Sequence, residues 1–197
     1  MRGTGRLRVG TVLMVASAFL VSTPRVAAGD DEEYVEFTED HPLGQPEAGK
    51  ALIYVLRPTS MGAAVKSFFI VDDTPVGINR GSSYFFIQVD PGKRLFWSKS
   101  ENVDALELAV EAGKPYYIQQ QVQMGGFRAR TKLEVLGEAA GQAALAKCKK
   151  HGTMTAKGRA EGARIVAEHK KDTQEDLDRR AEEAGEKQEK QKEKEGE

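Results

Sequence analysis

The side chains that could act in catalysis are few and widely separated along the sequence. The three histidines, His41, His151 and His169, lie outside the region with strand patterning, and none has the spacing to another histidine that a zinc site requires. The chain contains neither a Gly-x-Ser-x-Gly motif nor a glycine-rich phosphate loop followed by Lys-Ser or Lys-Thr. We therefore expect a non-enzymatic protein with no catalytic residues, no metal and no cofactor.

The acids within the strand region are the remaining candidates for general acid or base chemistry. They fall in expected turns or on expected solvent faces: Asp72, Asp73, Asp90 and Glu107. An enzyme would need some of them to converge in a pocket, and the sequence offers Asp72, Asp73 and Tyr84 as the set to look for. Their positions alone do not predict such a pocket.

A stronger pattern lies around Gly125 and Gly126. A diglycine tolerates the positive φ that both central residues of a two-residue hairpin loop require, so it predicts a tight hairpin at this point. In that register Gln121 faces Arg130 and Gln119 faces Lys132. The apolar residues then gather on the opposite face, and a slip of one residue would destroy this sorting.

The polar face of this hairpin is the candidate ligand face. Amides beside guanidinium groups can bind anionic or polyhydroxylated ligands, such as an envelope glycan or the acidic segment of a partner protein. The alternative is an ordinary solvated sheet face. The residues of the candidate face are Gln119, Gln121, Gln123, Arg128, Arg130 and Lys132.

Cys148 is the single cysteine, so an intramolecular disulfide is excluded. It stands between Lys147 and Lys149, and nearby positive charge lowers a thiol pKa and raises its reactivity. One interpretation is therefore a redox thiol that forms an intermolecular disulfide. The other is a cysteine that packs inside a helix.

Residues 81–97 predict the centre of the fold as a strand, a turn and a strand, and contain the one tryptophan, Trp97. Pro91-Gly92 has the type II turn signature, which does not suit a tight two-residue hairpin. We expect this corner to carry the chain from one sheet to another, with Trp97 as a core anchor. Residues 51–57 are apolar on both faces, which predicts a central strand covered on both sides.

Short strands with turns every eight to twelve residues predict a mostly β fold, an antiparallel β-sandwich of about seven to eight strands with a charged helical extension at the C-terminus. The expected divisions are a signal peptide over residues 1–28, an acidic flexible arm over 29–47, the sandwich over 48–137, a short helix over 138–151 and a charged tail over 152–197.

The N-terminal segment has the order of a secretory signal. Arginines come first, about a dozen apolar residues follow, and Ala28 precedes a plausible cleavage point. The alternative is an uncleaved membrane anchor. Cleavage would leave 25 basic and 30 acidic residues, a net charge of −5, which argues against nucleic-acid binding. The expected location is periplasmic or extracellular, with no integral membrane span after cleavage.

The tail from Lys170 to Glu197 has 19 charged residues out of 28. Pairs four residues apart, such as Asp176 with Arg180, favour a helix. Such a segment is too polar to make a core. The two interpretations are a partner-binding or spacer helix, including a coiled coil, and a solubilising disordered extension.

Five short segments follow one another in the strand region: ALIYVLRP at 51–58, FIVDDTPVG at 69–77, GSSYF at 81–85, DPG at 90–92 and GKPYYI at 113–118. Together they resemble the domain-of-unknown-function family numbered 2846, over about residues 48–137. The resemblance extends to the PEGA-type surface domains, which share the Pro-Gly turn between strands. It implies an immunoglobulin-like or PEGA-like sandwich at the cell envelope, where many such domains are lipoproteins, and it carries over no catalytic residue. This chain lacks the lipid-acceptor cysteine.

Together these patterns predict an exported, non-enzymatic β-sandwich protein that binds or scaffolds at the cell envelope, with an envelope protein or an anionic glycan as its partner. The alternative is an envelope enzyme or inhibitor that acts on glycan or peptide through the sandwich loops. A pocket that gathers Asp72, Asp73 and Tyr84 would favour the alternative.

Overall fold

The computed structural model describes residues 33–124 and 129–195. The predicted signal peptide at 1–28 lies outside the described residues. So do the predicted diglycine loop and Arg128 of the candidate ligand face. Within the described residues, no helix is both long and apolar enough to cross a membrane.

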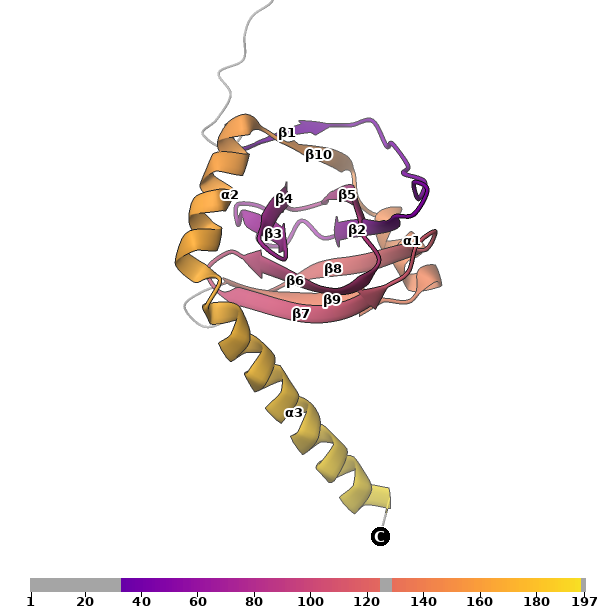
Figure 1. The fold of residues 1–197 in the computed structure, drawn as a ribbon, viewed down its shortest axis with the longest axis vertical. Helices are drawn as coiled ribbons and strands as arrows, with labels where there is room; N and C mark the ends of the chain where they lie inside the picture. Colours follow the sequence, from indigo (N-terminus) through magenta and orange to yellow (C-terminus); the bar gives the residue numbers. More distant parts are fainter. Residues whose placement is uncertain (1–32, 125–128, 196–197) are drawn as a thin grey trace, which may run out of the picture.

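Ten strands in the described residues form two packed sheets (Figure 1). The larger sheet has the order β1-β10-β5-β2-β8-β9, and the smaller has the order β4-β3-β6-β7. The strands are β1 Val35–Thr38, β2 Ala51–Arg57, β3 Ser67–Val71, β4 Thr74–Asn79, β5 Ser83–Val89, β6 Gly92–Lys99, β7 Val103–Val110, β8 Pro115–Met124, β9 Ala129–Leu136 and β10 Lys150–Met154.

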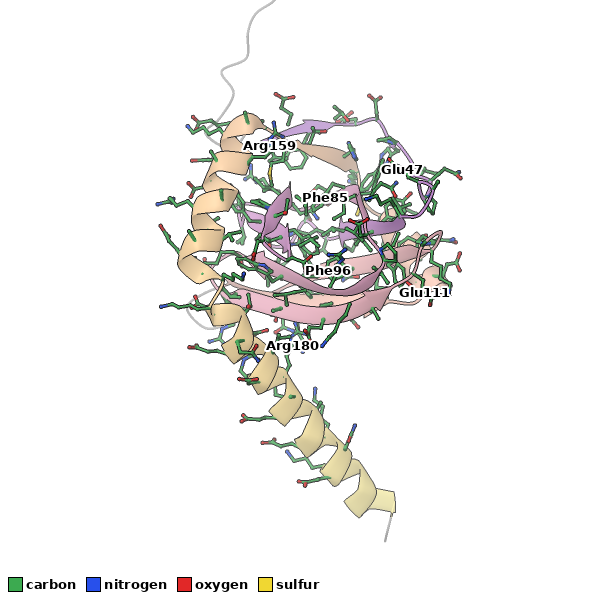
Figure 2. The ribbon with its side chains drawn as sticks, in the orientation of Figure 1. Glu47, Phe85, Phe96, Glu111, Arg159 and Arg180 are labelled. Atoms are coloured by element: carbon green, nitrogen blue, oxygen red, sulfur yellow. The ribbon has the colours of Figure 1, made fainter. Side chains whose placement is uncertain are left out.

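The main core lies between the sheets and is built from alternate residues of each strand. Phe85 of β5 and Phe96 of β6 point into this space (Figure 2), and their ring centroids lie 6.0 and 6.1 Å from that of Phe69 of β3. β2 contributes Ile53 and Val55 to the same cluster. Its other face contributes to a second cluster outside the larger sheet. The prediction of a central strand buried on both faces is therefore confirmed.

Three helices pack on the sandwich: α1 Glu138–Leu145, α2 Ala156–His169 and α3 Asp172–Glu195. α1 packs on β8 and β2, where Gly141 lies directly against Tyr117. α2 starts at Thr155, whose hydroxyl accepts a hydrogen bond from Gly158 N at 3.1 Å, and packs on β4 and β3. α3 meets the sandwich at β7 and then projects away from it (Figure 1). Of the two interpretations of the charged tail, a helix and a disordered extension, the structure has the helix, over Asp172–Glu195.

The predicted corner is confirmed. β5 ends at Val89 in the larger sheet, and β6 begins at Gly92 in the smaller one. Gly92 has a φ of 119°, a conformation that favours glycine. Trp97 is fully buried, as expected of an anchor. It lies on the outer face of the smaller sheet, in a cluster that includes Ile165 of α2.

The sandwich is larger than the sequence predicted, and it is mixed rather than purely antiparallel. β1 and β10 come from the predicted arm and the predicted tail, and they pair with each other. The pairs β10 with β5 and β2 with β8 are parallel. His151 therefore lies inside a sheet. The helix predicted to reach residue 151 ends at Leu145, because the chain must turn back to form β10. Pairing between such distant segments leaves no local signal.

The β8–β9 register differs from the prediction by two residues. Gln123 pairs with Arg130 and Gln121 pairs with Lys132. The described residues of both strands nevertheless keep the predicted alternation of faces, because side chains alternate with a period of two and a shift of two preserves it. The hydrophobic pattern therefore fixed the faces but not the partners.

Candidate functional site: a polar groove between the last hairpin and helix α3

The described residues of the candidate ligand face do share one side of β8 and β9. Gln123 and Arg130 are exposed, whereas Gln119, Gln121 and Lys132 are half-buried. The face also includes an acid: the side-chain amide of Gln121 donates a hydrogen bond to the carboxylate of Glu134 on β9. The Gln121–Glu134 pair occupies the middle of the face. The cationic side chains of Arg130 and Lys132 therefore lie toward the end of the hairpin where β8 connects to β9.

At that end the hairpin and α3 enclose a groove of about 950 Å³. Three residues of the candidate face line it, namely Gln123, Arg130 and Lys132. Gln121 lines a smaller neighbouring groove of about 510 Å³. The other wall comes from α3, and Figure 2 shows Arg180 where this helix meets the sandwich. The tail, which the sequence left open as a spacer or a disordered extension, therefore builds half of the site.

A buried ionic network holds α3 in this position. Asp104 of β7 and Asp176 of α3 are 4% and 6% exposed. The Arg180 guanidinium contacts both carboxylates, with its Nε 3.2 Å from Asp176 Oδ2. Asp176 also accepts a hydrogen bond of 2.8 Å from the backbone N–H of Ala105, 71 residues away in sequence. Such a network fixes the helix against the edge of the smaller sheet.

The same network occupies the free edge of β9, the last strand of the larger sheet. The Asn102 amide pairs with the backbone of Thr131: its Nδ2 donates to Thr131 O at 3.0 Å, and its Oδ1 accepts from Thr131 N at 2.8 Å. Asp104 accepts from Leu133 N, and Arg180 donates to Leu133 O at 3.3 Å. These side chains replace a neighbouring strand, which protects the edge. They also hold the β9 backbone beside Arg130 and Lys132, whose side chains alternate with those of Thr131 and Leu133.

Three of the acids that line the groove, Asp104, Asp176 and Glu183, already have an arginine as partner. Glu183 accepts from Arg179 at 2.8 Å, and this contact is the main reason that the pKa of Glu183 lies below its usual value. Asp172 contacts the His169 ring at 2.9 Å. Arg130 and Lys132 form no ion pair within the described part of the chain, and so they can receive an anionic group from a ligand.

Burial dominates the electrostatics of Asp104. Its pKa is raised above the ordinary value of 3.8 by desolvation, although the N–H of Leu133 and the charge of Arg180 act in the opposite direction. The carboxyl therefore holds its proton more tightly in the folded chain than in the unfolded one. Docking of α3 depends on Arg180 to offset this cost.

Sequence reasoning missed Asn102, Asp104 and Arg180 as site residues. The Asp176–Arg180 pair was visible as a helix-stabilising spacing, and Leu177 beside it was one of the few apolar residues of the tail. Leu177 packs against the cluster around Trp97. An isolated apolar residue next to an acid–base pair was the available signal that this part of the tail docks.

Cys148 lies away from this groove and is 2% exposed. Its Sγ donates to Ala144 O at 3.6 Å, and burial raises the pKa of the thiol to about 11. The flanking lysines therefore do not activate it. These observations favour the packing interpretation, and the intermolecular disulfide stays a prediction for a non-reducing gel.

Tyr84 does not join Asp72 and Asp73 in a pocket. Asp72 accepts from Arg94 at 3.0 Å at the β3–β4 turn, and Asp73 forms an ion pair with Lys170 at 2.7 Å. Tyr84 is buried outside the larger sheet. Within residues 33–124 and 129–195, no group of three or more His, Cys, Asp or Glu side chains is placed to hold a metal ion.

The two packed sheets with helices on their outer faces define a mostly β sandwich protein. Residues 47–132 match the model of the family described as "Protein of unknown function (DUF2846)". The predicted resemblance to this family is thereby confirmed for residues 47–132, whereas the resemblance to PEGA-type domains stays a prediction. The matched region contains Arg130 and Lys132, whereas α3 lies outside it.

A curated relative, an uncharacterised protein of Haemophilus influenzae (strain Rd), is 31% identical over 104 residues. The match covers 52% of this chain and 61% of the relative. No solved structure matches the chain.

Proposed function

We propose that the protein is an exported, non-enzymatic binding module of the cell envelope, and that the groove between β9 and α3 holds an acidic group of its ligand. The observation that carries this proposal is the pair Arg130 and Lys132, which line the groove and form no ion pair within the described residues, whereas its acids Asp104, Asp176 and Glu183 already have an arginine partner. Export is supported by the signal-like segment at 1–28. The resemblance to PEGA-type surface domains supports a place at the envelope.

The chemistry of the groove favours an anionic polymer over a small apolar molecule. A guanidinium binds a carboxylate or a sulfate through two parallel hydrogen bonds, and the Gln123 amide beside it can donate to a hydroxyl. The groove is open and its walls are charged. Nucleic acid is disfavoured because the chain without residues 1–28 has a net charge of −5. The fitting ligands are an acidic glycan and the acidic segment of an envelope protein.

The alternative, an envelope enzyme or inhibitor, requires convergent acids. Asp72 and Asp73 lie at the β3–β4 turn and Tyr84 lies outside the larger sheet, which supports the binding proposal over that alternative.

The proposal is tested by replacing both cations, Arg130→Ser and Lys132→Ser, in one variant. Fluorescence anisotropy at low salt would measure its binding to labelled alginate and to labelled poly-glutamate. We expect the wild-type chain to bind at least one of these probes and the variant to bind it at least tenfold more weakly, with both affinities falling as salt rises.

The matched control removes the same charge elsewhere, with Lys147→Ser and Lys149→Ser, two exposed residues that do not line the groove. Equal loss in the control would reduce the effect to net charge. Absence of binding by the wild-type chain to both probes, or undiminished binding by the groove variant, would reject the proposal.

A further inference from the structure

A second recognition surface lies on the outer face of the larger sheet, across β2 and β5, away from the groove at β9 and α3. The chain from residue 41 to residue 47, here called the cis segment, lies on this face. None of the backbone-to-backbone hydrogen bonds in the described part of the chain involves residues 41–46. Side chains of the sheet hold the segment instead.

Two tyrosines bind its backbone at alternate residues. Tyr84 Oη donates to Pro42 O at 2.9 Å. Tyr54 Oη donates to Gly44 O at 3.1 Å and accepts from Gly44 N at 2.9 Å. One hydroxyl thus satisfies both backbone groups of Gly44, as a neighbouring strand would.

A glutamine continues the same pattern along the segment. Gln88 Nε2 donates to Gln45 O at 2.8 Å, and Gln88 Oε1 accepts from Glu47 N at 3.2 Å. Glu47 lies at the end of the segment, beside the sandwich (Figure 2). Three side chains on two adjacent strands therefore recognise the backbone of one extended peptide.

The contacts also select a sequence. A Cβ added to Gly44 would lie 2.7 Å from Phe86 Cδ2 and 3.0 Å from Leu52 Cδ1, closer than packed atoms approach. Pro42 lacks an N–H and so needs no hydrogen-bond acceptor at its nitrogen. Leu43 between them is 70% exposed, so the face does not select the residue at this position. The face therefore fits the pattern Pro-x-Gly.

Aromatic rings with hydrogen-bonding groups that hold a proline-containing extended segment form a recurrent kind of peptide site. We propose that this outer face is a binding site for an extended Pro-x-Gly peptide of a partner protein, and that the cis segment is its built-in competitor. A tethered segment acts at an effective concentration of about millimolar, so it blocks weaker peptides. A partner must match the Pro-x-Gly chemistry to displace it. This proposal does not depend on ligand binding in the groove, so experiments can reject either proposal without rejecting the other.

The test displaces the cis segment from the face by mutation and then adds the same sequence as a separate peptide. In the full chain, Gly44→Val places a side chain against Phe86 and releases the cis segment. The probe is a fluorescein-labelled peptide with the sequence of residues 40–48, DHPLGQPEA. We expect it to bind the Gly44→Val chain at least tenfold more tightly than the wild-type chain. The same peptide with valine in place of glycine should not bind.

Tyr54→Phe in the Gly44→Val chain removes the hydroxyl that holds the glycine, and should weaken the peptide about tenfold. Tyr116→Phe is the matched control, because its hydroxyl accepts a hydrogen bond from Glu111 N and does not touch the cis segment. It should leave peptide binding unchanged.

A second emptied chain, with residues 41–46 replaced by a Gly-Ser linker of equal length, guards against a local effect of valine. Failure of the peptide to bind either emptied chain overturns the proposal. Equal binding of the glycine and valine peptides does so too, since the face would then not select its sequence.

Discussion

Removal of Arg180 should destabilise the protein strongly, because Arg180 is the shared cation of two buried carboxylates. The side chains of Asp104 and Asp176 are 5% and 6% exposed, whereas that of Arg180 is 23% exposed. Breaking a buried ion pair by removing one partner typically costs about 3–5 kcal/mol, since the remaining charge stays desolvated. Partial exposure of Arg180 places Arg180→Ala at the low end, at about 3 kcal/mol.

Arg179→Ala is the matched control. Arg179 is the neighbouring residue on α3 and contacts Asp176 and Glu183, but its side chain is 52% exposed. An exposed ion pair contributes about 0–1 kcal/mol. Both variants lose one arginine and one positive charge from the same helix, so the difference between them reports the burial of the Asp104–Asp176 network.

Urea unfolding followed by the fluorescence of Trp97 would measure both costs, because Trp97 is the single tryptophan and is fully buried. For a slope of about 2 kcal/mol per molar urea, a loss of about 3 kcal/mol lowers the midpoint by about 1.5 M. A double-mutant cycle of Arg180→Ala with Asp104→Asn should show a coupling energy above about 1 kcal/mol. If Arg180→Ala costs no more than Arg179→Ala, the network does not hold α3.

Two further predictions follow from burial. The pKa of Asp104 is raised in the folded chain, so its contribution to stability is present below pH 3.8 and is lost as the pH rises through its folded pKa. The stability of Asp104→Asn relative to wild type should therefore increase with pH across that window, as measured by urea unfolding at a series of acid to neutral pH values. A difference that does not change with pH would contradict the raised pKa. For Cys148, an increase in the thiol pKa from 9.0 to about 11 lowers the thiolate fraction at neutral pH about a hundredfold. Ellman's reagent should label the native chain at least a hundred times more slowly than the urea-unfolded chain, and equal rates would show that the thiol is accessible.

Local patterns predicted the corner of the sandwich and the faces of its strands. Pro91-Gly92 identified the point where the chain changes sheets, and the continuous apolar run over residues 51–57 identified a strand that is buried on both faces. They did not predict the partners of the strands. The β8–β9 register was wrong by two residues, since alternation is insensitive to such a shift.

Only one wall of the candidate site could be predicted from the sequence. Arg130 and Lys132 could be assigned to one polar face because they alternate with buried neighbours on β9. The acidic and basic residues of α3 gave no sign of where they dock, because their spacing is also that of a solvated helix. The cis segment was equally hidden, since Pro42 and Gly44 are ordinary loop residues until Tyr54 and Tyr84 lie beneath them.

The sequence by itself determined which residues face the core and where the chain turns, because these properties follow from backbone geometry over a few residues. The tertiary structure decided that β1 pairs with β10, that Asp104 meets Arg180, and that the cis segment lies on the larger sheet. These contacts join segments far apart in the chain. Their formation depends on the total burial of the folded molecule, which no local pattern encodes.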